Sequence, residues 1–381
     1  MSGQAKRTDV AVIGGGVMGA SIAYHLARAG AAVTVLERRA IAAAASGASA
    51  GGVRQQGRDL RELPLARHAC ARWATLETEL DADVHYRRKG HLTLIEREDD
   101  RPALDASVAR QRAAGLDIVV VEGDELRTLA PAVSPHVLAG SYTRDDGHAD
   151  PARTTRAFAA AAERAGAAIR TDVTVTGLAA TGGRVTGVTT DAGLVAADVT
   201  VLAAGAWSTA LAATVGLRLP IEPMGLQMIR TQPVPHCLDQ VVGCVGHRLS
   251  FKQLPSGAFL IGGGWPGDWS LDNSRGVVRP ASIFGSALDA SAIIPAVRAA
   301  PLDDAWVGIE ARSADEAPIL GLAPGLDGLV LATGFSGHGF QLSPAIGQVI
   351  SELIVAGQPS IPLDALALTR FANVLAGSNN G

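Results

Sequence analysis

The segment from Asp9 to Glu37 limits the possible folds of this chain more than any other stretch of the sequence. A short, apolar, β-branched run, Val10 to Ile13, precedes Gly14-Gly15-Gly16-Val17-Met18-Gly19 and then residues with the apolar spacing of a helix. A second apolar run ends at Glu37. This order of strand, glycine-rich turn, helix, strand and acid predicts a βαβ unit.

Each glycine of the G-x-G-x-x-G pattern has a separate physical task. Gly14 permits the tight turn, Gly16 lets a pyrophosphate approach the backbone, and Gly19 lets the helix pack closely on the strand. The free N–H groups at the start of the helix, from Val17 onward, then face the phosphates. Glu37 accepts hydrogen bonds from ribose hydroxyls and repels a 2′-phosphate. We therefore predict that this unit binds FAD or NAD, and not NADP.

Length and charge exclude several classes of partner. A chain of 381 residues, 48% of them hydrophobic, is long enough for two domains with their own cores. The formal net charge of −4 includes no basic or acidic block, so we expect no nucleic-acid partner. The polar start, Met1 to Thr8, is too short for a signal peptide and no apolar run could span a bilayer. We expect a cytoplasmic protein.

The three cysteines, Cys70, Cys237 and Cys244, are widely spaced and match no metal-ligand pattern. We therefore expect no metal site, and thiols that stay reduced in the cytoplasm.

The periodicity changes along the chain in a way that predicts two domains built from alternating segments. Helices are expected over 60–80, either kinked or split at Pro64, and over 287–299, and a hairpin is expected over 184–196. The predicted fold is α/β plus α+β: a discontinuous Rossmann-like FAD-binding domain and a second, mainly antiparallel substrate domain. The expected segments are 1–85, 146–218 and 313–381 for the first domain, and 86–145 and 219–312 for the second.

The loop Gly334-Phe335-Ser336-Gly337-His338-Gly339-Phe340 repeats the arrangement of the first motif, because it joins a buried strand to the start of a helix. Such a turn presents several backbone N–H donors to one ligand group. In a flavoprotein that group is the N1–C2=O edge of the flavin, which gains negative charge on reduction. His338 is either a helix-start residue without a chemical role or a catalytic imidazole.

Together these motifs resemble the FAD-dependent D-amino-acid-oxidase (DAO) family, in particular its sarcosine oxidase and glycine oxidase branch. The resemblance covers essentially the whole chain. It is carried by 14–19 with Glu37, Ser49-Ala-Gly-Gly-Val-Arg-Gln-Gln56, Asp146-Gly-His-Ala-Asp-Pro151, Ala203-Ala-Gly-Ala-Trp-Ser208, Trp306-Val-Gly-Ile-Glu310, 315–321 and 334–340.

The resemblance implies FAD and oxidation of the C–N bond of an amino acid or related amine, which is secondary, N-substituted or D-configured. A hydride passes to flavin N5, the resulting imine hydrolyses, and the electrons go to O2 or another acceptor. The residues expected at the cofactor are Gly14, Gly16, Val17, Met18, Gly19, Glu37, Arg38, Ser46, Ser49, Gly51, Gly52, Val53, Val173, Ala204, Gly205, Trp207, Gly334, Phe335, Ser336, Gly337, His338, Gly339, Phe340 and Gln341.

The expected catalytic residues are Arg54, Lys252, His338 and Gln341. Arg54 ends a stretch of small residues and corresponds to an arginine beside flavin and substrate in relatives. Lys252 lies roughly where some sarcosine oxidases place a lysine that promotes reaction with oxygen, although a surface lysine fits the sequence equally well. Monomeric sarcosine oxidases bind the substrate carboxylate with a lysine where this chain has Gln341. Either Arg54 or Arg312 then holds the carboxylate, or the substrate is not a simple N-methyl amino acid.

Those enzymes also attach the flavin through a cysteine that this chain lacks, so the resemblance implies non-covalent FAD. Two alternatives remain open. Gln55, Gln56 and Gln341 are similar to residues of multimeric amine dehydrogenases, in which case the chain is a catalytic or assembly subunit with partner chains. A flavin monooxygenase is the other, but the sequence contains no second nucleotide fingerprint.

Overall fold

The computed structural model describes residues 8–373. The polar start of the chain therefore lies, apart from Thr8, outside the described residues. Within the described range, no helix is both long enough and apolar enough to cross a membrane.

The first sheet has the parallel core that the βαβ pattern predicted. Its strand order is β19-β20-β11-β1-β2-β8, and β1 pairs in parallel with both β2 and β11. Val10 and Val12 of β1 are fully enclosed, since helices and loops cover both faces. The strands are β1 (Thr8–Ile13), β2 (Val33–Leu36), β8 (Ala168–Arg170), β9 (Val175–Thr181), β10 (Arg184–Thr190), β11 (Gly193–Leu202), β19 (Ile319–Leu322) and β20 (Leu329–Thr333).

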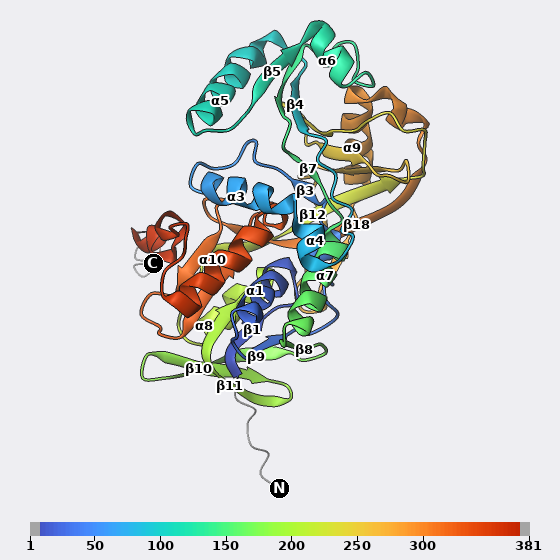
Figure 1. Cartoon of the computed structure of the whole chain (residues 1–381). Helices are drawn as coiled ribbons and strands as arrows, with labels where there is room; N and C mark the ends of the chain where they lie inside the picture. Colours follow the sequence, from blue (N-terminus) through green and yellow to red (C-terminus); the bar gives the residue numbers. More distant parts are fainter. Residues whose placement is uncertain (1–7, 374–381) are drawn as a thin grey trace.

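Helices α1 (Val17–Arg28), α7 (Pro151–Arg164), α8 (Ser208–Ala213) and α10 (Ser343–Ala356) belong to this half of the molecule. Helix α1 packs between α7 and α10 (Figure 1). Asp150 caps α7 by accepting a hydrogen bond from the Arg153 backbone N–H at 2.8 Å, and Pro151 occupies the first turn.

The second sheet is antiparallel except for one pair. Its order is β18-β12-β15-β14-β13-β4-β6-β5, and only β4 and β13 run in parallel. The strands are β4 (His91–Ile95), β5 (Val119–Glu122), β6 (Ala139–Thr143), β12 (Ile221–Thr231), β13 (Val241–Cys244), β14 (Ser250–Gln253), β15 (Phe259–Gly262) and β18 (Leu302–Ser313). Helices α5 (Arg101–Ala113), α6 (Gly123–Leu129) and α9 (Pro280–Ile293) cover this half, at the end of the molecule opposite the β10–β11 hairpin (Figure 1).

Two helix predictions were wrong in their bounds. The expected helix over 60–80 is two helices, α3 (Leu63–Trp73) and α4 (Leu76–Leu80), and Pro64 lies in the first turn of α3, where its missing N–H costs nothing. The helix expected over 287–299 begins and ends earlier, as α9, and a 3₁₀ turn follows from Pro295 because proline cannot continue the α-helix.

The remaining short elements complete the two halves. They are α2 (Ala45–Ala48), the paired β3 (Gly52–Val53) and β7 (Gly147–His148), the paired β16 (Asp268–Ser270) and β17 (Arg275–Val277), and 3₁₀ turns at 98–100, 205–207, 340–342, 364–366 and 368–371. The second sheet draws its strands from 91–143 and 221–313. This distribution supports our division of the chain at 85, 145, 218 and 312, which remains a proposal.

Candidate cofactor and substrate site

One long cavity of about 370 Å³ connects the first sheet with strand β18 of the second. The glycine-rich turn lies at one part of its wall and the 334–340 loop at another, so the two motifs near the chain ends face one ligand space. The lining residues are Ile13, Gly14, Gly16–Met18, Leu36–Arg39, Ala44–Ser46, Ser49, 173–176, 203–207, Ala210, Leu211, Ile309–Ala311, Ala332, Phe335, Gly337, Gly339 and Phe340.

The glycines of the first motif divide their tasks as predicted. Gly14 has a φ of 109°, a backbone conformation that favours glycine. A Cβ on Gly19 would lie 2.0 Å from the Gly14 carbonyl oxygen, so this residue packs α1 against the turn and does not line the cavity. Gly16 does line it, directly before α1, where the Ser46 hydroxyl accepts a hydrogen bond from the Val17 N–H at 2.9 Å.

The Glu37 carboxylate is held in place for a nucleotide. The backbone N–H groups of Gly15 and Arg39 donate to its two oxygens at 2.7 and 2.8 Å. Each oxygen retains a lone pair for a ribose hydroxyl. Beside it, the Arg38 guanidinium stacks 3.7 Å above the Trp207 ring, and its buried Nη2 has no hydrogen-bond partner among the described residues. An unpaired buried donor in a cavity wall is well placed for a ligand oxygen.

The second motif is anchored to strand β18. The Ser336 N–H donates to the Ala311 carbonyl at 2.9 Å, and the Ser336 hydroxyl accepts from the Ser313 N–H at 3.2 Å. Ser336 and Gly337 both have positive φ, 54° and 83°. The loop therefore turns sharply at the cavity, where Gly337 and Gly339 present their backbone to the ligand space.

The segment around Gly51 lies against a buried cation. Lys252 is only 3% exposed, and its Nζ lies 3.4 Å from the Ala149 carbonyl oxygen. A Cβ added to Gly51 would come within 3.3 Å of the same Nζ. Burial lowers the pKa of Lys252 to about 7, against a small opposing effect of Asp150. The surface alternative for Lys252 is therefore wrong, although the residue does not itself line the cavity.

Arg54 is half-buried and lies beside a group of buried polar residues behind the cavity wall. Burial lowers its pKa, and the charges of Asp146 and Glu62 act in the opposite direction. Asp146 is fully buried and accepts hydrogen bonds from the backbone N–H groups of Gln55 and Gln56 at 2.8 and 3.2 Å. Burial nevertheless raises the pKa of Asp146 to about 6. These bonds fix the direction of the chain directly after Arg54.

Gln341 is fully buried and ties the 334–340 loop to helix α3. Its side chain donates to the Ala66 carbonyl at 2.7 Å and accepts from Arg58 at 3.3 Å, while its own carbonyl accepts from the Trp73 indole at 2.8 Å. The structure gives Gln341 a positioning role in place of the catalytic role that we expected. His338 likewise turns away from the cavity, toward Glu62 at 3.3 Å.

Most of the predicted cofactor residues line the cavity. Those that do not are Gly19, Gly51, Gly52, Val53, Gly334, Ser336, His338 and Gln341. Of these, Gly19, Ser336 and Gln341 pack against or hydrogen-bond to the elements that form the wall. None of the four expected catalytic residues lines the cavity itself; they are Arg54, Lys252, His338 and Gln341.

Sequence reasoning missed several parts of the wall. Residue 174 enters it from the turn before β9 and residues 175 and 176 from the start of β9, while Ile309, Glu310 and Ala311 enter it from the end of β18. The other lining residues that were not expected include Ala44, Ala45, Ala210, Leu211 and Ala332. Glu310 carried a visible signal, since it is a single charge within the otherwise apolar run from Val307 to Ala311.

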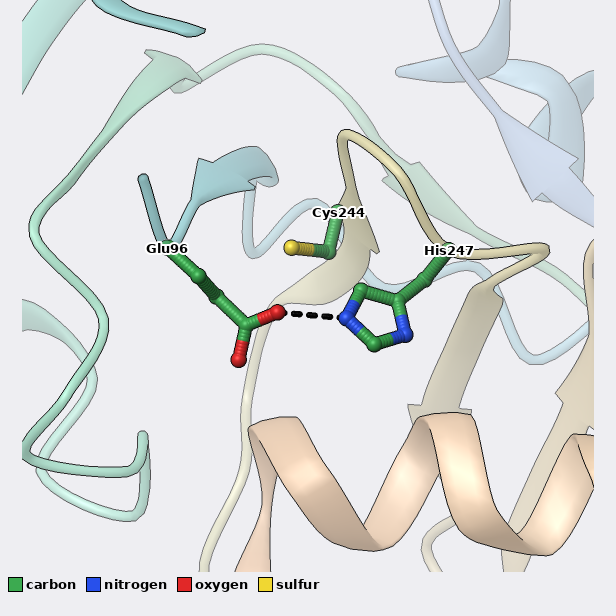
Figure 2. Close-up of side chains that lie close together, drawn as sticks. All are labelled: Glu96, Cys244 and His247. Atoms are coloured by element: carbon green, nitrogen blue, oxygen red, sulfur yellow. Dashed lines mark hydrogen bonds and ion pairs between the residues drawn. The ribbon is translucent and has the colours of Figure 1, made fainter. Parts of the chain in front are cut away.

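A separate cluster of side chains that could bind a metal ion lies in the half of the molecule built on the second sheet (Figure 2). Ligand atoms of Glu96, Cys244 and His247 lie within 4.8 Å of one another. The Glu96 carboxylate pairs with both His136 and His247, and the other ring nitrogen of His247 contacts Asp289 at 2.8 Å. The carboxylates and imidazoles of this cluster thus form an ion-pair network, and the Cys244 thiol donates instead to the Val245 carbonyl at 3.5 Å.

The fold and cavity together define a flavin-type dinucleotide-binding oxidoreductase. A Rossmann turn, a ribose-binding acid, an unpaired arginine nitrogen and a second backbone cradle all face one cavity, and they fit FAD along its length.

Comparison with known proteins assigns the family. The model of the FAD-dependent oxidoreductase (DAO) family matches residues 9–353, and the chain belongs to this family. Glycine oxidase from Bacillus licheniformis is 29% identical over 373 residues, 93% of this chain and 94% of that protein. Sarcosine oxidase subunit beta from Rhizobium meliloti is 28% identical, over 95% and 88%. The structure of L-proline dehydrogenase from P. horikoshii superposes with a TM-score of 0.91 at 27% identity, covering 97% and 99%.

Proposed function

We propose that this protein binds FAD without a covalent bond and oxidises the C–N bond of an amino acid or related amine to an imine, which hydrolyses. The observation that carries the proposal is the single cavity joining the βαβ turn to the 334–340 loop beneath β18. When bound, FAD supplies the oxidant that takes a hydride from the substrate carbon. The electrons then pass to dioxygen or to another acceptor.

The residues of the chain bind, orient and shield. Gly16 and the start of α1 hold the phosphates, and Glu37 holds the ribose. Phe335 and Phe340 make the far wall apolar and limit access of water to the reacting carbon. Arg54, beside Asp146 and behind the cavity wall, supplies the positive charge that attracts a substrate carboxylate.

A panel of amines tests the reaction. Sarcosine, D-amino acids, L- and D-proline and opine-like secondary amines are mixed anaerobically with the purified holoprotein, and the flavin absorbance is followed. We expect at least one of them to bleach the oxidised flavin, whereas NADPH does not. Bleaching by NADPH alone would favour the monooxygenase alternative, and no bleaching by any amine would contradict the proposal.

The non-covalent attachment has its own test. None of the three cysteines lines the cavity. Precipitation with acid should therefore release yellow FAD into the supernatant, and colour that remains in the protein pellet would contradict this part of the proposal.

One relative favours a second candidate function, that of a subunit in a larger enzyme. The chain aligns with 88% of a sarcosine oxidase subunit that is designated beta. On this reading the protein acts within a larger complex with partner subunits. Mass determination by light scattering on protein purified from its native source separates the two candidates: a mass equal to one chain or a multiple of it supports the free-standing enzyme.

A further inference from the structure

Glu310 is an ionisable group in the cavity wall beside the second glycine-rich loop. It lies on β18, opposite Met224 of β12, between the lining residues Ile309 and Ala311. The backbone N–H of Gly337 donates a hydrogen bond to its carboxylate. The Ser336 backbone N–H also donates a hydrogen bond to the Ala311 carbonyl, so the backbones of β18 and of the 334–340 loop fix the position of Glu310 relative to the loop.

The charge of Glu310 has no internal partner. Burial raises the pKa of Glu310 to about 7. Within residues 8–373, the hydrogen bond from Gly337 is the only influence that lowers this pKa. The other carboxylate of the cavity, Glu37, already accepts two backbone hydrogen bonds at the nucleotide end. Glu310 is half-buried. A carboxylate with little access to water is destabilised in its charged form unless a ligand supplies the positive charge.

The cations of the cavity wall do not serve this purpose. Arg38 stacks on Trp207, and the Arg39 guanidinium donates to the Ala43 carbonyl at 2.7 Å, both on the side of Glu37. The lining residues next to Glu310 in the chain, Ile309 and Ala311, carry no charge, and neither does Phe335 of the second loop. A cationic group of the substrate is therefore the natural partner for this carboxylate.

We propose that Glu310 binds the amino group of the substrate and takes a proton from its ammonium form, so that the neutral amine is oxidised. This inference rests on the proposed function. The N–H bond breaks, an O–H bond forms on Glu310, and the electron pair stays on nitrogen, so no electrons are exchanged in this step. That pair forms the C=N bond when the hydride leaves the neighbouring carbon for bound FAD.

The assignment also determines which ligands the site accepts. An amine protonated at neutral pH pairs with the carboxylate, whereas the corresponding 2-hydroxy acid has no positive charge to offer. A second carboxylate of the substrate would be repelled from this part of the cavity. The protein should therefore discriminate amino acids from hydroxy acids of the same shape.

The test compares Glu310→Gln with Asp304→Asn, a matched change at a 53% exposed position of the same strand. Flavin reduction by the best amine is measured anaerobically from pH 5.5 to 9.5. In the parent and in Asp304→Asn the rate should rise through an apparent pKa near 7. In Glu310→Gln the rate at pH 7 should fall at least tenfold, and its rise should move at least one pH unit higher, with FAD content unchanged.

A binding measurement keeps this inference separate from the proposed function. 2-Aminoisobutyrate has no hydrogen on its α-carbon and cannot be oxidised there, so its binding is read from the change in flavin absorbance. We expect Glu310→Gln to weaken this binding at least tenfold and 2-hydroxyisobutyrate to bind neither protein. If no amine reduces the flavin, the proposed function fails and this titration still decides the role of Glu310. Equal binding by both proteins, or an unchanged pH profile, would overturn the inference.

Discussion

An added methyl group should have different effects at Gly16 and at Gly19 of the first motif. At Gly19 it should lower the stability, and at Gly16 it should weaken FAD binding. In Gly19→Ala the new Cβ would lie 2.0 Å from the Gly14 carbonyl oxygen and 3.2 Å from its carbon. Both are backbone atoms of the turn, so α1 must move away from β1. Overpacking of this kind costs up to about 3 kcal/mol, and the higher helix propensity of alanine returns about 1 kcal/mol.

The expected net loss of about 2 kcal/mol corresponds to a fall in Tm of roughly 2–3 °C for an apoprotein of this length. Gly16→Ala should behave differently. Gly16 has φ −75° and ψ 175°, which any residue adopts, and its Cβ would meet only the Ser46 hydroxyl at 3.1 Å. Since it is the N-cap residue, the change costs about 0.5 kcal/mol of stability. Its methyl group, however, would enter the space that the pyrophosphate needs.

The assay measures stability and cofactor affinity separately. Differential scanning fluorimetry on the apoproteins gives Tm, and titration with FAD followed by flavin fluorescence gives Kd. Gly19→Ala should lower Tm, whereas Gly16→Ala should keep Tm within about 1 °C and raise Kd at least tenfold, about 1.4 kcal/mol. A parent-like Tm for Gly19→Ala would refute the packing argument. A parent-like Kd for Gly16→Ala would refute the assignment of the cavity to a dinucleotide.

Three further outcomes follow from the charged groups. Arg54→Met should retain FAD and slow flavin reduction by amines that carry a carboxylate at least tenfold, with amines that lack one little affected; anaerobic stopped-flow measurements compare the two. Lys252→Met should leave that reduction unchanged and slow reoxidation by dioxygen, which is measured by mixing the reduced protein with oxygenated buffer. His247→Ala should lower Tm more at pH 6 than at pH 9, because Asp289 and Glu96 raise the pKa of His247 against the effect of burial. Stability from a raised pKa is fully present below the unfolded value of about 6.5 and is lost as the pH rises through the folded pKa.

The nucleotide end of the cavity could be predicted from sequence because its signals are local. Gly14, Gly16 and Glu37 lie within one βαβ unit, where turn geometry and hydrogen bonding depend on neighbours in the chain. The 334–340 loop was found for the same reason. The cavity wall could not be completed in this way, since Thr174 and Glu310 reach it only through the packing of distant segments.

The burial of Lys252 could likewise not be predicted from its residue type and its neighbours in the sequence. Lys252 occurs in a short strand whose sequence allows either an exposed or a buried lysine. It is buried because β14 lies inside the second sheet, between β13 and β15, and its side chain faces the segment around Gly51. The split of the expected 60–80 helix has a similar origin. No proline or glycine lies between Trp73 and Leu76, so local propensity gives no stop signal there.

The position after the second loop shows how the structure narrows a choice that the sequence left open. A lysine at position 341 could not accept the hydrogen bond that Arg58 donates to Gln341, so this glutamine belongs to the connection between α3 and the loop. The substrate carboxylate then requires another cation. Arg312 is 48% exposed and pairs with the exposed Glu222 at 3.5 Å. Arg54 is held beside buried Asp146, where low dielectric strengthens its field. Of the two arginines, Arg54 is therefore the one whose loss should raise the KM for amino acids, and Arg312→Met provides the matched control that should not.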